Sequence, residues 1–338
     1  MYIDARIPKE LLMPYRLLSG SFPIWVYMKA HSRRKTIFER LFSKACRWLF
    51  RSMQSMGEAT GKMRWAHASL GGRNFSFNSL NTQFHSIYQY VDGYELDVMA
   101  SILTFLHKDG VFLDVGANWG HFSFAIASAP DFRGKVIAFE PSKSTYGDFL
   151  HILNQMPDVR ERIEPRNAAL SDMTGTSFLS TSNMYSGVAA VSGDNEKGEL
   201  IDLVKLDDLG LSHLDLIKID VEGHESEVLQ GAVKTLSKLH PVVIIENWYK
   251  PETIMSDIKP LAYLEALGYR LFMASIALAD DPVAIGSMKA APCQQFGLSM
   301  IEFDHTQRAF FERHRNVIAI HSDQVASIGR NSVKKETL

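Results

Sequence analysis

Two acidic residues stand at the ends of consecutive apolar runs, where a carboxylate could bind the polar groups of a nucleoside. The first run, 111–115, contains Asp114 and leads into the turn Gly116-Ala-Asn-Trp-Gly120, and the second, 136–139, is followed by Glu140. Glycine tolerates a positive φ and lets the backbone approach a ligand closely. A glycine turn after one parallel strand and an acid after the next are typical of nucleotide-cofactor sites, with the acid at the ribose hydroxyls.

The turn itself discriminates between nucleotide cofactors. The dinucleotide fingerprint G-x-G-x-x-G places bare backbone against a pyrophosphate at a helix N-terminus. Here Asn118 and His121 stand where the second and third glycines would be, and the sequence has no phosphate-binding G-x-x-x-x-G-K-[ST] motif. The turn, with Gly116 and Gly120, therefore favours a cofactor with an adenosine, an amino-acid tail and no phosphates, which is S-adenosylmethionine. Asp114 and the turn amides would meet the ammonium and carboxylate groups of that tail.

A second set of ionisable residues follows the apolar run 214–219. Asp220, Glu222, His224 and Glu225 lie within six consecutive positions at the start of a predicted helix. Such clustering at a sheet edge is costly unless the groups pair, bind cations or change pKa. We expect Asp220 to face the cleft, and His224, with an unperturbed pKa of about 6.5, to be a candidate base for a hydroxyl proton. The helix dipole offers a structural reason for Glu222 and Glu225 in the first turn.

Glu246 and Asn247 end the next apolar run, beside Asp220 if the two strands are neighbours. Carboxylate and amide oxygens on adjacent strand ends suit Mg²⁺. A bound cation would lower the pKa of an acceptor hydroxyl from about 16. A polar substrate cleft without metal is the alternative, so the sequence leaves the identity of any metal ligands unknown.

The order of the predicted elements brings these residues to one edge of a sheet. A helix with apolar residues at helical spacing is predicted at 94–106, before the first strand. The predicted strands are 111–115, 135–139, 163–169, 214–219, 241–246 and 316–320, and the predicted helices are 119–128, 142–155, 223–238 and 257–267. This alternation predicts an α/β, Rossmann-like fold with a doubly wound, mostly parallel sheet and its site at the strand carboxyl ends.

Composition limits the function classes. The 338 residues suffice for one large or two modest domains, and 46% hydrophobic with 22% charged residues is typical of soluble globular proteins. The net charge of −2 gives no overall attraction to nucleic acid. Cys46 and Cys293 fit isolated reduced thiols in a cytoplasmic protein. No run approaches the ~18 apolar residues of a membrane-spanning helix. Asp4 and Glu10, with no apolar core after them, argue against a cleaved signal peptide.

The segment 29–51 is basic and amphipathic. Its charged residues are Lys29, Arg33, Arg34, Lys35, Arg40, Lys44, Arg47 and Arg51, against Glu39 alone. Its apolar residues Ile37, Phe38, Leu41, Phe42, Ala45, Trp48 and Leu49 recur at helical spacing. The pattern is typical of a peripheral membrane-surface helix. The alternative is that the apolar face docks on the catalytic core or on a second subunit.

From about residue 94 to 269, and more loosely to 320, the chain resembles the FkbM-type methyltransferases, a branch of the Rossmann-like S-adenosylmethionine-dependent enzymes. The residues that carry the resemblance are Tyr94-Glu95, Phe112–Gly120, Ala138–Pro141, Asn167–Asp172, Ile217–Glu225 and Ile244–Glu246. The sequence Ile-Lys-Ile-Asp-Val-Glu-Gly-His-Glu at 217–225 is much more specific than any glycine turn. Residues 1–90 carry no part of the resemblance.

The resemblance implies a class I methyltransferase fold that binds S-adenosylmethionine. Asp114, Gly116, Asn118 and Gly120 would line its methionine side and Glu140 its ribose, while Ser171 and Asp172 would lie at the adenine edge or cap the following turn. The expected reaction is an in-line methyl transfer to a hydroxyl oxygen, accelerated mainly by alignment. Sugar or glycan hydroxyls lead as acceptors, ahead of polyketide-like hydroxyls and then amines or carboxylates.

Two other functions remain open. An NAD(P)-dependent oxidoreductase is disfavoured by Asn118 and His121, and a non-catalytic membrane- or partner-docking protein by the intact acidic and glycine positions. We divide the chain into an N-terminal extension, 1–90, a methyltransferase domain, 91–325, and a flexible tail, 326–338. The resemblance also implies an antiparallel edge strand near 316–320, and a loop within 186–213 is expected to cover the cleft. The sequence leaves the oligomeric state unknown.

Overall fold

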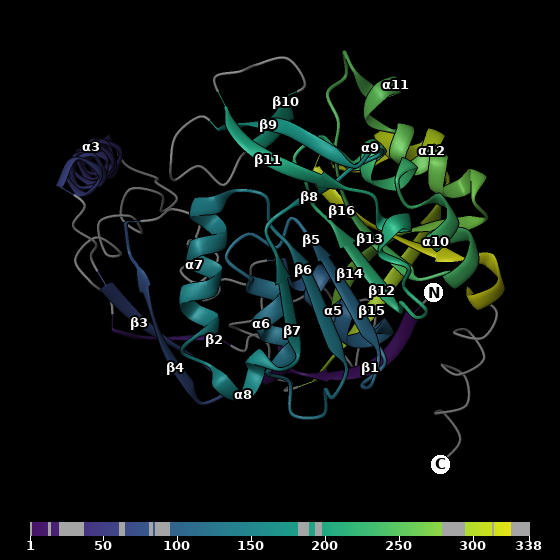
Figure 1. The fold of residues 1–338 in the computed structure, drawn as a ribbon, viewed down its shortest axis with the longest axis horizontal. Helices are drawn as coiled ribbons and strands as arrows, with labels where there is room; N and C mark the ends of the chain where they lie inside the picture. The colour runs from purple at the N-terminus through teal and green to yellow at the C-terminus, as the bar shows by residue number, and fades with distance from the viewer. Residues whose placement is uncertain are drawn as a thin grey trace.

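The computed structural model of the chain describes the following residues: 2–12, 15–19, 37–60, 65–80, 84, 95–181, 189–192, 198–278, 295–312 and 314–325. Their largest unit is a nine-stranded sheet with the order β1-β15-β14-β16-β13-β12-β5-β6-β7 (Figure 1). Cys293 and the predicted tail 326–338 lie outside the described residues.

One half of this sheet is parallel and carries the predicted site. Its strands are β5 (Val111–Val115), β6 (Lys135–Phe139), β7 (Ile163–Arg166), β12 (Leu216–Ile219) and β13 (Val242–Trp248). The chain runs outward from β5 through β6 to β7 and then returns to β12 on the other side of β5. The strand order therefore reverses between β5 and β12, and ligands of open α/β sheets bind at such a switch point.

Helices cover both faces of the parallel half, as the doubly wound prediction requires (Figure 1). One face carries α5 (Leu96–Phe105), α6 (His121–Ala127) and α7 (Lys143–Leu153), and the other α9 (Glu225–Gln230), α10 (Val233–Leu239) and α12 (Lys259–Ala266). Alternate residues of β5 enter the two cores: Phe112 packs with α5 to α7 and Leu113 with α9 to α12. Burial on both faces explains the continuous apolar runs in the sequence.

Two predicted elements are each split in the structure. The helix predicted at 223–238 is interrupted at Gly231, where a Cβ atom would lie 1.9 Å from the carbonyl oxygen of Ser171. The strand predicted at 163–169 ends with β7, and β8 (Ala169–Leu170) joins a second sheet of order β10-β9-β11-β8. The other members of that sheet are β9 (Gly175–Thr181), β10 (Ala189–Ser192) and β11 (Glu199–Val204). The helix predicted at 257–267 is present as α12, and the short α11 (Ile254–Asp257) precedes it.

The other half of the main sheet is antiparallel. It contains β14 (Tyr269–Leu278), β15 (Gln295–Phe303), β16 (His314–His321) and, at the edge, β1 (Tyr2–Pro8). The strand predicted at 316–320 is antiparallel to its neighbours, but its prediction as an edge strand is wrong, because β16 lies between β13 and β14. The N-terminal segment thus completes the central sheet.

The remaining described N-terminal elements include a second small sheet, which contacts α7 through its strand β4. They are α1 (Lys9–Leu12), β2 (Tyr15–Ser19), α3 (Ile37–Thr60), β3 (Trp65–Leu70) and β4 (Arg73–Asn78), with β2, β3 and β4 paired in a three-stranded sheet. The Tyr15 hydroxyl donates a hydrogen bond to the carbonyl of His121, 2.5 Å away, and fixes β2 to the start of α6. Among the described helices, none has the length and apolarity that crossing a bilayer would need.

Candidate active site

The glycine turn after β5 is held in left-handed backbone conformations. Gly116, Asn118 and Gly120 have φ values of 76°, 54° and 93°. A Cβ atom on Gly116 would lie 1.9 Å from the carbonyl oxygen of Asp220, and one on Gly120 would lie 2.6 Å from ring atoms of Phe124. Both glycines are therefore required by packing as well as by φ. The turn sits directly against the backbone that follows β12.

Asp114 lies buried beneath this turn. Its Oδ2 accepts a hydrogen bond from the Ser123 hydroxyl at 2.6 Å, while its Oδ1 is buried without a hydrogen-bond partner among the described residues. Burial raises the pKa of Asp114, although the Lys218 ammonium and Ser123 oppose that rise. A buried acceptor without a donor costs roughly 1–3 kcal/mol. This oxygen is therefore suited to receive a donor group from a ligand.

Glu140 follows β6 and is oriented by two backbone amides. Its Oε2 accepts from the Asn118 N–H at 3.0 Å and its Oε1 from the Ser142 N–H at 2.9 Å. Burial raises the pKa of Glu140 to about 7, against these two hydrogen bonds. Each carboxylate oxygen retains further acceptor capacity, which a vicinal diol can use. The Asn118 side chain instead closes the turn, because its Oδ1 accepts from the Trp119 N–H at 2.8 Å.

The residues predicted at the adenine edge meet a predicted catalytic residue. The Ser171 hydroxyl donates to Asp172 at 3.1 Å and lies 2.9 Å from Nε2 of His224. His224 is also 3.6 Å from the carboxylate of Glu227. Burial lowers the pKa of His224, although Glu227 and Asp172 oppose this. His224 thus contacts Ser171 and Glu227. The three predicted catalytic residues therefore divide into two groups, with His224 in one and Asp220 and Glu222 in the other.

The other group is an acid cluster at the carboxyl ends of β12 and β13. Asp220, Glu246 and Glu95 each place a carboxylate oxygen within 4.8 Å of the other two. Buried Lys218 donates from Nζ to Asp220 at 2.9 Å. Burial alone would raise the pKa of Asp220, but the Lys218 charge and hydrogen bond outweigh it, so this pKa lies below its usual value. Burial, with Glu246 and Asp220 nearby, raises the pKa of Glu222 to about 7.

Glu95 was not among the predicted site residues of this cluster, and neither was His314. Its Nε2 is 2.5 Å from Oε1 of Glu246, and its ring stacks on Trp248 with centroids 4.1 Å apart. The hydrogen bond that His314 donates to the Glu246 carboxylate raises the pKa of His314, while burial raises the pKa of Glu246. His314 begins β16 opposite Trp248 at the end of β13. The predicted antiparallel strand at 316–320 was the signal that could have placed His314 here. An antiparallel strand begins beside the end of its neighbour, where the acids of the cluster lie.

The proposed trio of metal ligands is not assembled. Asn247 accepts from Nε of Arg308 at 2.8 Å and donates to the carbonyl of Asp257 at 2.8 Å, so its amide ties β13 to two later segments. Glu95, which precedes α5, is the third acid beside Asp220 and Glu246. The hypothesis of Asn247 as a ligand is therefore wrong, and a cation here would meet three carboxylates.

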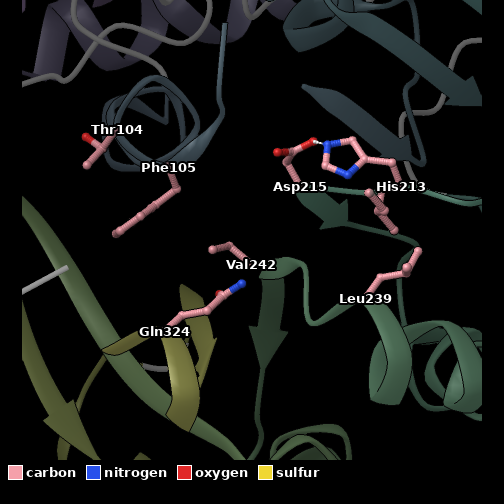
Figure 2. Close-up of a pocket in the computed structure, with 8 residues that line it drawn as sticks. Thr104, Phe105, His213, Asp215, Leu239, Val242 and Gln324 are labelled. Atoms are coloured by element: carbon pink, nitrogen blue, oxygen red, sulfur yellow. Dashed lines mark ion pairs between the residues drawn. The ribbon is translucent and has the colours of Figure 1, made fainter. Parts of the chain in front are cut away.

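A cavity of about 360 Å³ lies at the opposite, amino edge of the sheet. Figure 2 shows His213 and Asp215 on one side of it and Thr104, Phe105 and Gln324 on the other. The His213–Asp215 ion pair measures 2.7 Å. Asp215 directly precedes β12 and Val242 begins β13, whereas the acid cluster lies at the other ends of these strands. The cavity is therefore separate from the acid cluster.

Comparison with known proteins identifies the central part of the chain. Residues 114–271 match the family model described as the methyltransferase FkbM domain. The hexuronic acid methyltransferase AglP of Haloferax volcanii is 29% identical over 155 residues, which is 44% of this chain and 61% of that protein. The methyltransferase sdnD of Sordaria araneosa is 28% identical over 192 residues, 46% of this chain and 72% of that protein. The chain thus spans about three fifths of the first relative.

Two solved structures complete the comparison. The methyltransferase FkbM of Methylobacillus flagellatus shares 16% identity at a TM-score of 0.38, over 64% of this chain and 55% of that one. The putative transferase PH0793 of Pyrococcus horikoshii shares 13% identity at a TM-score of 0.39, over 81% of this chain and 84% of that one.

Proposed function

Since this chain belongs to the FkbM methyltransferase family, we propose that it transfers the methyl group of S-adenosylmethionine to a hydroxyl oxygen of a sugar or a related small molecule. One observation carries the proposal. The glycine turn, which lacks a phosphate-binding motif, is in contact with the acid cluster, because Gly116 lies against the carbonyl of Asp220. A donor held by the turn would therefore present its reactive end to an acceptor held by the acids.

The residues of the turn fit the donor. The buried, unsatisfied Oδ1 of Asp114 suits an ammonium group, and Glu140 suits the ribose diol. Ser171 and Asp172 stay predictions for the adenine edge. When bound, S-adenosylmethionine supplies an electrophilic methyl group on a sulfonium. Asp114 and Glu140 would bind and orient the two polar ends of the donor, and the turn would fix the distance between them.

On the acceptor side, we assign His314 as the proton acceptor. Its Nε2 hydrogen-bonds Glu246, which leaves Nδ1 to take the proton of the attacking hydroxyl. As the oxygen–methyl bond forms and the sulfur–methyl bond breaks, that proton moves to Nδ1 of His314. Asp220 is a weaker base, because the Lys218 ammonium holds its pKa down. Asp220 and Glu222 would instead accept hydrogen bonds from the hydroxyl groups of the substrate and orient it.

The surroundings of His314 favour a sugar over a flat polyketide. The Trp248 side chain is 58% exposed and stacks on His314 at the rim of the cluster. An exposed indole offers an apolar face to the C–H side of a pyranose and a polar N–H at its edge. Carboxylates around it can accept hydrogen bonds from several hydroxyls. The hexuronic acid relative is consistent with this acceptor class.

The metal requirement stays a prediction with a direct test. The Lys218 ammonium already brings positive charge to the acids, so we expect activity to survive chelation. Loss of activity in EDTA, restored by Mg²⁺, would assign the cation to Glu95, Asp220 and Glu246.

The decisive experiment uses the purified full chain with S-adenosylmethionine and two acceptor panels, one of hexoses and hexuronates and one of polyketide-like alcohols. Formation of S-adenosylhomocysteine is followed by mass spectrometry, and donor binding by calorimetry. We expect donor binding that Glu140→Ala weakens and turnover with the sugar panel. Binding of NADH in place of the methyl donor would support the oxidoreductase, and the absence of donor binding would overturn the proposal.

A further inference from the structure

Helix α3 presents three different stripes along its 24 residues. One stripe faces the protein: Cys46 and Phe50 are buried, and the Gln54 amide donates to the carbonyl of Leu80 at 2.9 Å. This stripe belongs to the same hydrophobic core as Phe77 of β4. The helix is therefore anchored by one side only, at the periphery of the molecule (Figure 1).

The second stripe is apolar and exposed. Phe38, Leu41, Trp48 and Met56 expose 77%, 60%, 72% and 67% of their surface. Their spacings of three, seven and eight residues return to one side of a helix with 3.6 residues per turn. The alternative prediction placed Phe38, Leu41 and Trp48 against the catalytic core, but these side chains lie at the surface. Exposed aromatic and aliphatic groups gathered in this way mark an interaction site.

The third stripe is basic and borders the apolar one. Arg40, Lys44 and Arg51 are exposed, and they follow one another at spacings of four and seven residues. Four further basic residues, Lys29, Arg33, Arg34 and Lys35, precede the helix in the sequence, outside the described residues. An apolar stripe beside a basic one is the arrangement of helices that lie in the interface of a bilayer.

We propose that α3 docks the protein on an anionic lipid surface. Phe38, Leu41 and Trp48 enter the boundary between headgroups and acyl chains, while Arg40 and Lys44 bind lipid phosphates. Charge selects this occupant over a second copy of the chain. A symmetric contact between two α3 helices would bring like basic stripes together, and a two-fold interface repeats the same patch on both sides. Anionic lipid neutralises that stripe instead.

The test is flotation of the full chain with vesicles that contain phosphatidylserine, and with vesicles of phosphatidylcholine alone. We expect binding to the anionic vesicles, weakened by salt because the attraction is screened. The double variant Arg40→Gln/Lys44→Gln should bind about 25-fold more weakly, at about fivefold for each cation near the surface. Leu41→Ser/Trp48→Ser should weaken binding at least tenfold and at all salt concentrations.

Two matched control variants distinguish docking through α3 from nonspecific adsorption to the vesicles. Phe310 is 85% exposed on η4 (His305–Phe310), and Lys238 is exposed on α10, so Phe310→Ser and Lys238→Gln should bind vesicles as the parent does. Equal binding to both kinds of vesicle, or unchanged binding by the α3 variants, would overturn the proposal. So would the absence of vesicle binding together with a dimer that Trp48→Ser dissociates in analytical ultracentrifugation. Donor binding by the α3 variants reports on the fold independently.

Discussion

The two edges of the central sheet use their carboxylates differently. At the amino edge, Asp215 accepts a hydrogen bond from the Val111 N–H at 2.7 Å and pairs with His213 at 2.7 Å. That carboxylate joins the starts of β5 and β12. At the carboxyl edge, the oxygens of Asp220 and Glu246 instead face each other and Glu95, with one buried lysine among them.

From this difference we infer that Asp215 is a structural acid and that the clustered acids serve the proposed reaction. Asp215 stabilises the fold, because it accepts a backbone N–H and pairs with His213 at the start of two strands. Carboxylates that converge repel one another and shift their pKa values, which costs stability. A sheet that holds such a cluster at the edge where ligands of α/β folds bind is organised for chemistry there. The acids at the carboxyl edge should therefore affect turnover as well as stability, and Asp215 at the amino edge should affect stability alone.

The largest effect is expected from Asp220→Ala. It leaves the buried Lys218 ammonium without its closest partner, and a buried charge left alone costs about 3–5 kcal/mol. Urea denaturation measures the loss in the free energy of unfolding. The control is Lys218→Met/Asp220→Ala, which removes both charges and should recover most of the loss. A loss below about 1 kcal/mol in the single variant would mean that the pair is solvated.

Removal of the base should affect turnover instead of the fold. We expect His314→Gln to lower kcat by about 100-fold or more, with donor affinity and thermal midpoint unchanged. The rate of the parent should rise with pH through the pKa of His314, since only neutral imidazole accepts a proton and Glu246 raises that pKa. Trp48→Ser, far along the chain on α3, serves as the activity control. An unchanged pH profile in His314→Gln would assign the proton to another group, with Glu222 the first candidate.

The opposite edge gives the contrasting result. Asp215→Ala removes the acceptor of the Val111 N–H, and an amide left without a partner costs about 1–3 kcal/mol. Turnover per folded molecule should stay at the parental value, because the cavity beside Asp215 lies at the amino edge. Denaturation and a steady-state assay on the same preparation test both statements. A fall in kcat at full folding would show that the two edges communicate.

The sequence predicted the parallel half of the sheet more closely than the cluster that it supports. The strands 111–115 and 135–139 have the predicted bounds, because apolar runs between glycine-containing turns leave little choice of element. The glycine turn and its two acids likewise follow local rules. Gly231 shows the limit, since the break in the predicted helix there depends on the backbone of Ser171, sixty positions earlier.

The cluster itself depends on pairing over long distances in the chain. His314 reaches Glu246 only because β16 is inserted beside β13, and no local pattern marks a histidine at the start of a strand. The sequence predicted Asn247 as a cation ligand, but in the structure its amide oxygen accepts a hydrogen bond from Arg308 of η4. Residues whose role is set by distant partners are those that a single sequence predicts least well.

The smallest predicted effect concerns the donor side, where a single acid titrates. Burial raises the pKa of Glu140 to about 7 in the free protein, and hydrogen bonds from a ribose diol would stabilise its ionised form. Donor binding should then release a proton, so that affinity rises about tenfold between about pH 6 and about pH 8 and levels off above. The same raised pKa has the opposite effect on folding. The native state holds the proton between about pH 4.5 and about pH 7, so the free energy of unfolding falls as pH rises through that window.

Calorimetry across this pH range measures how donor affinity depends on pH. The variant Glu140→Gln removes the contribution of Glu140 and keeps the titration of the donor's own amino group. If parent and variant show the same slope, the ribose does not meet Glu140, and the contrast between a quiet donor side and a charged acceptor side would have to be redrawn.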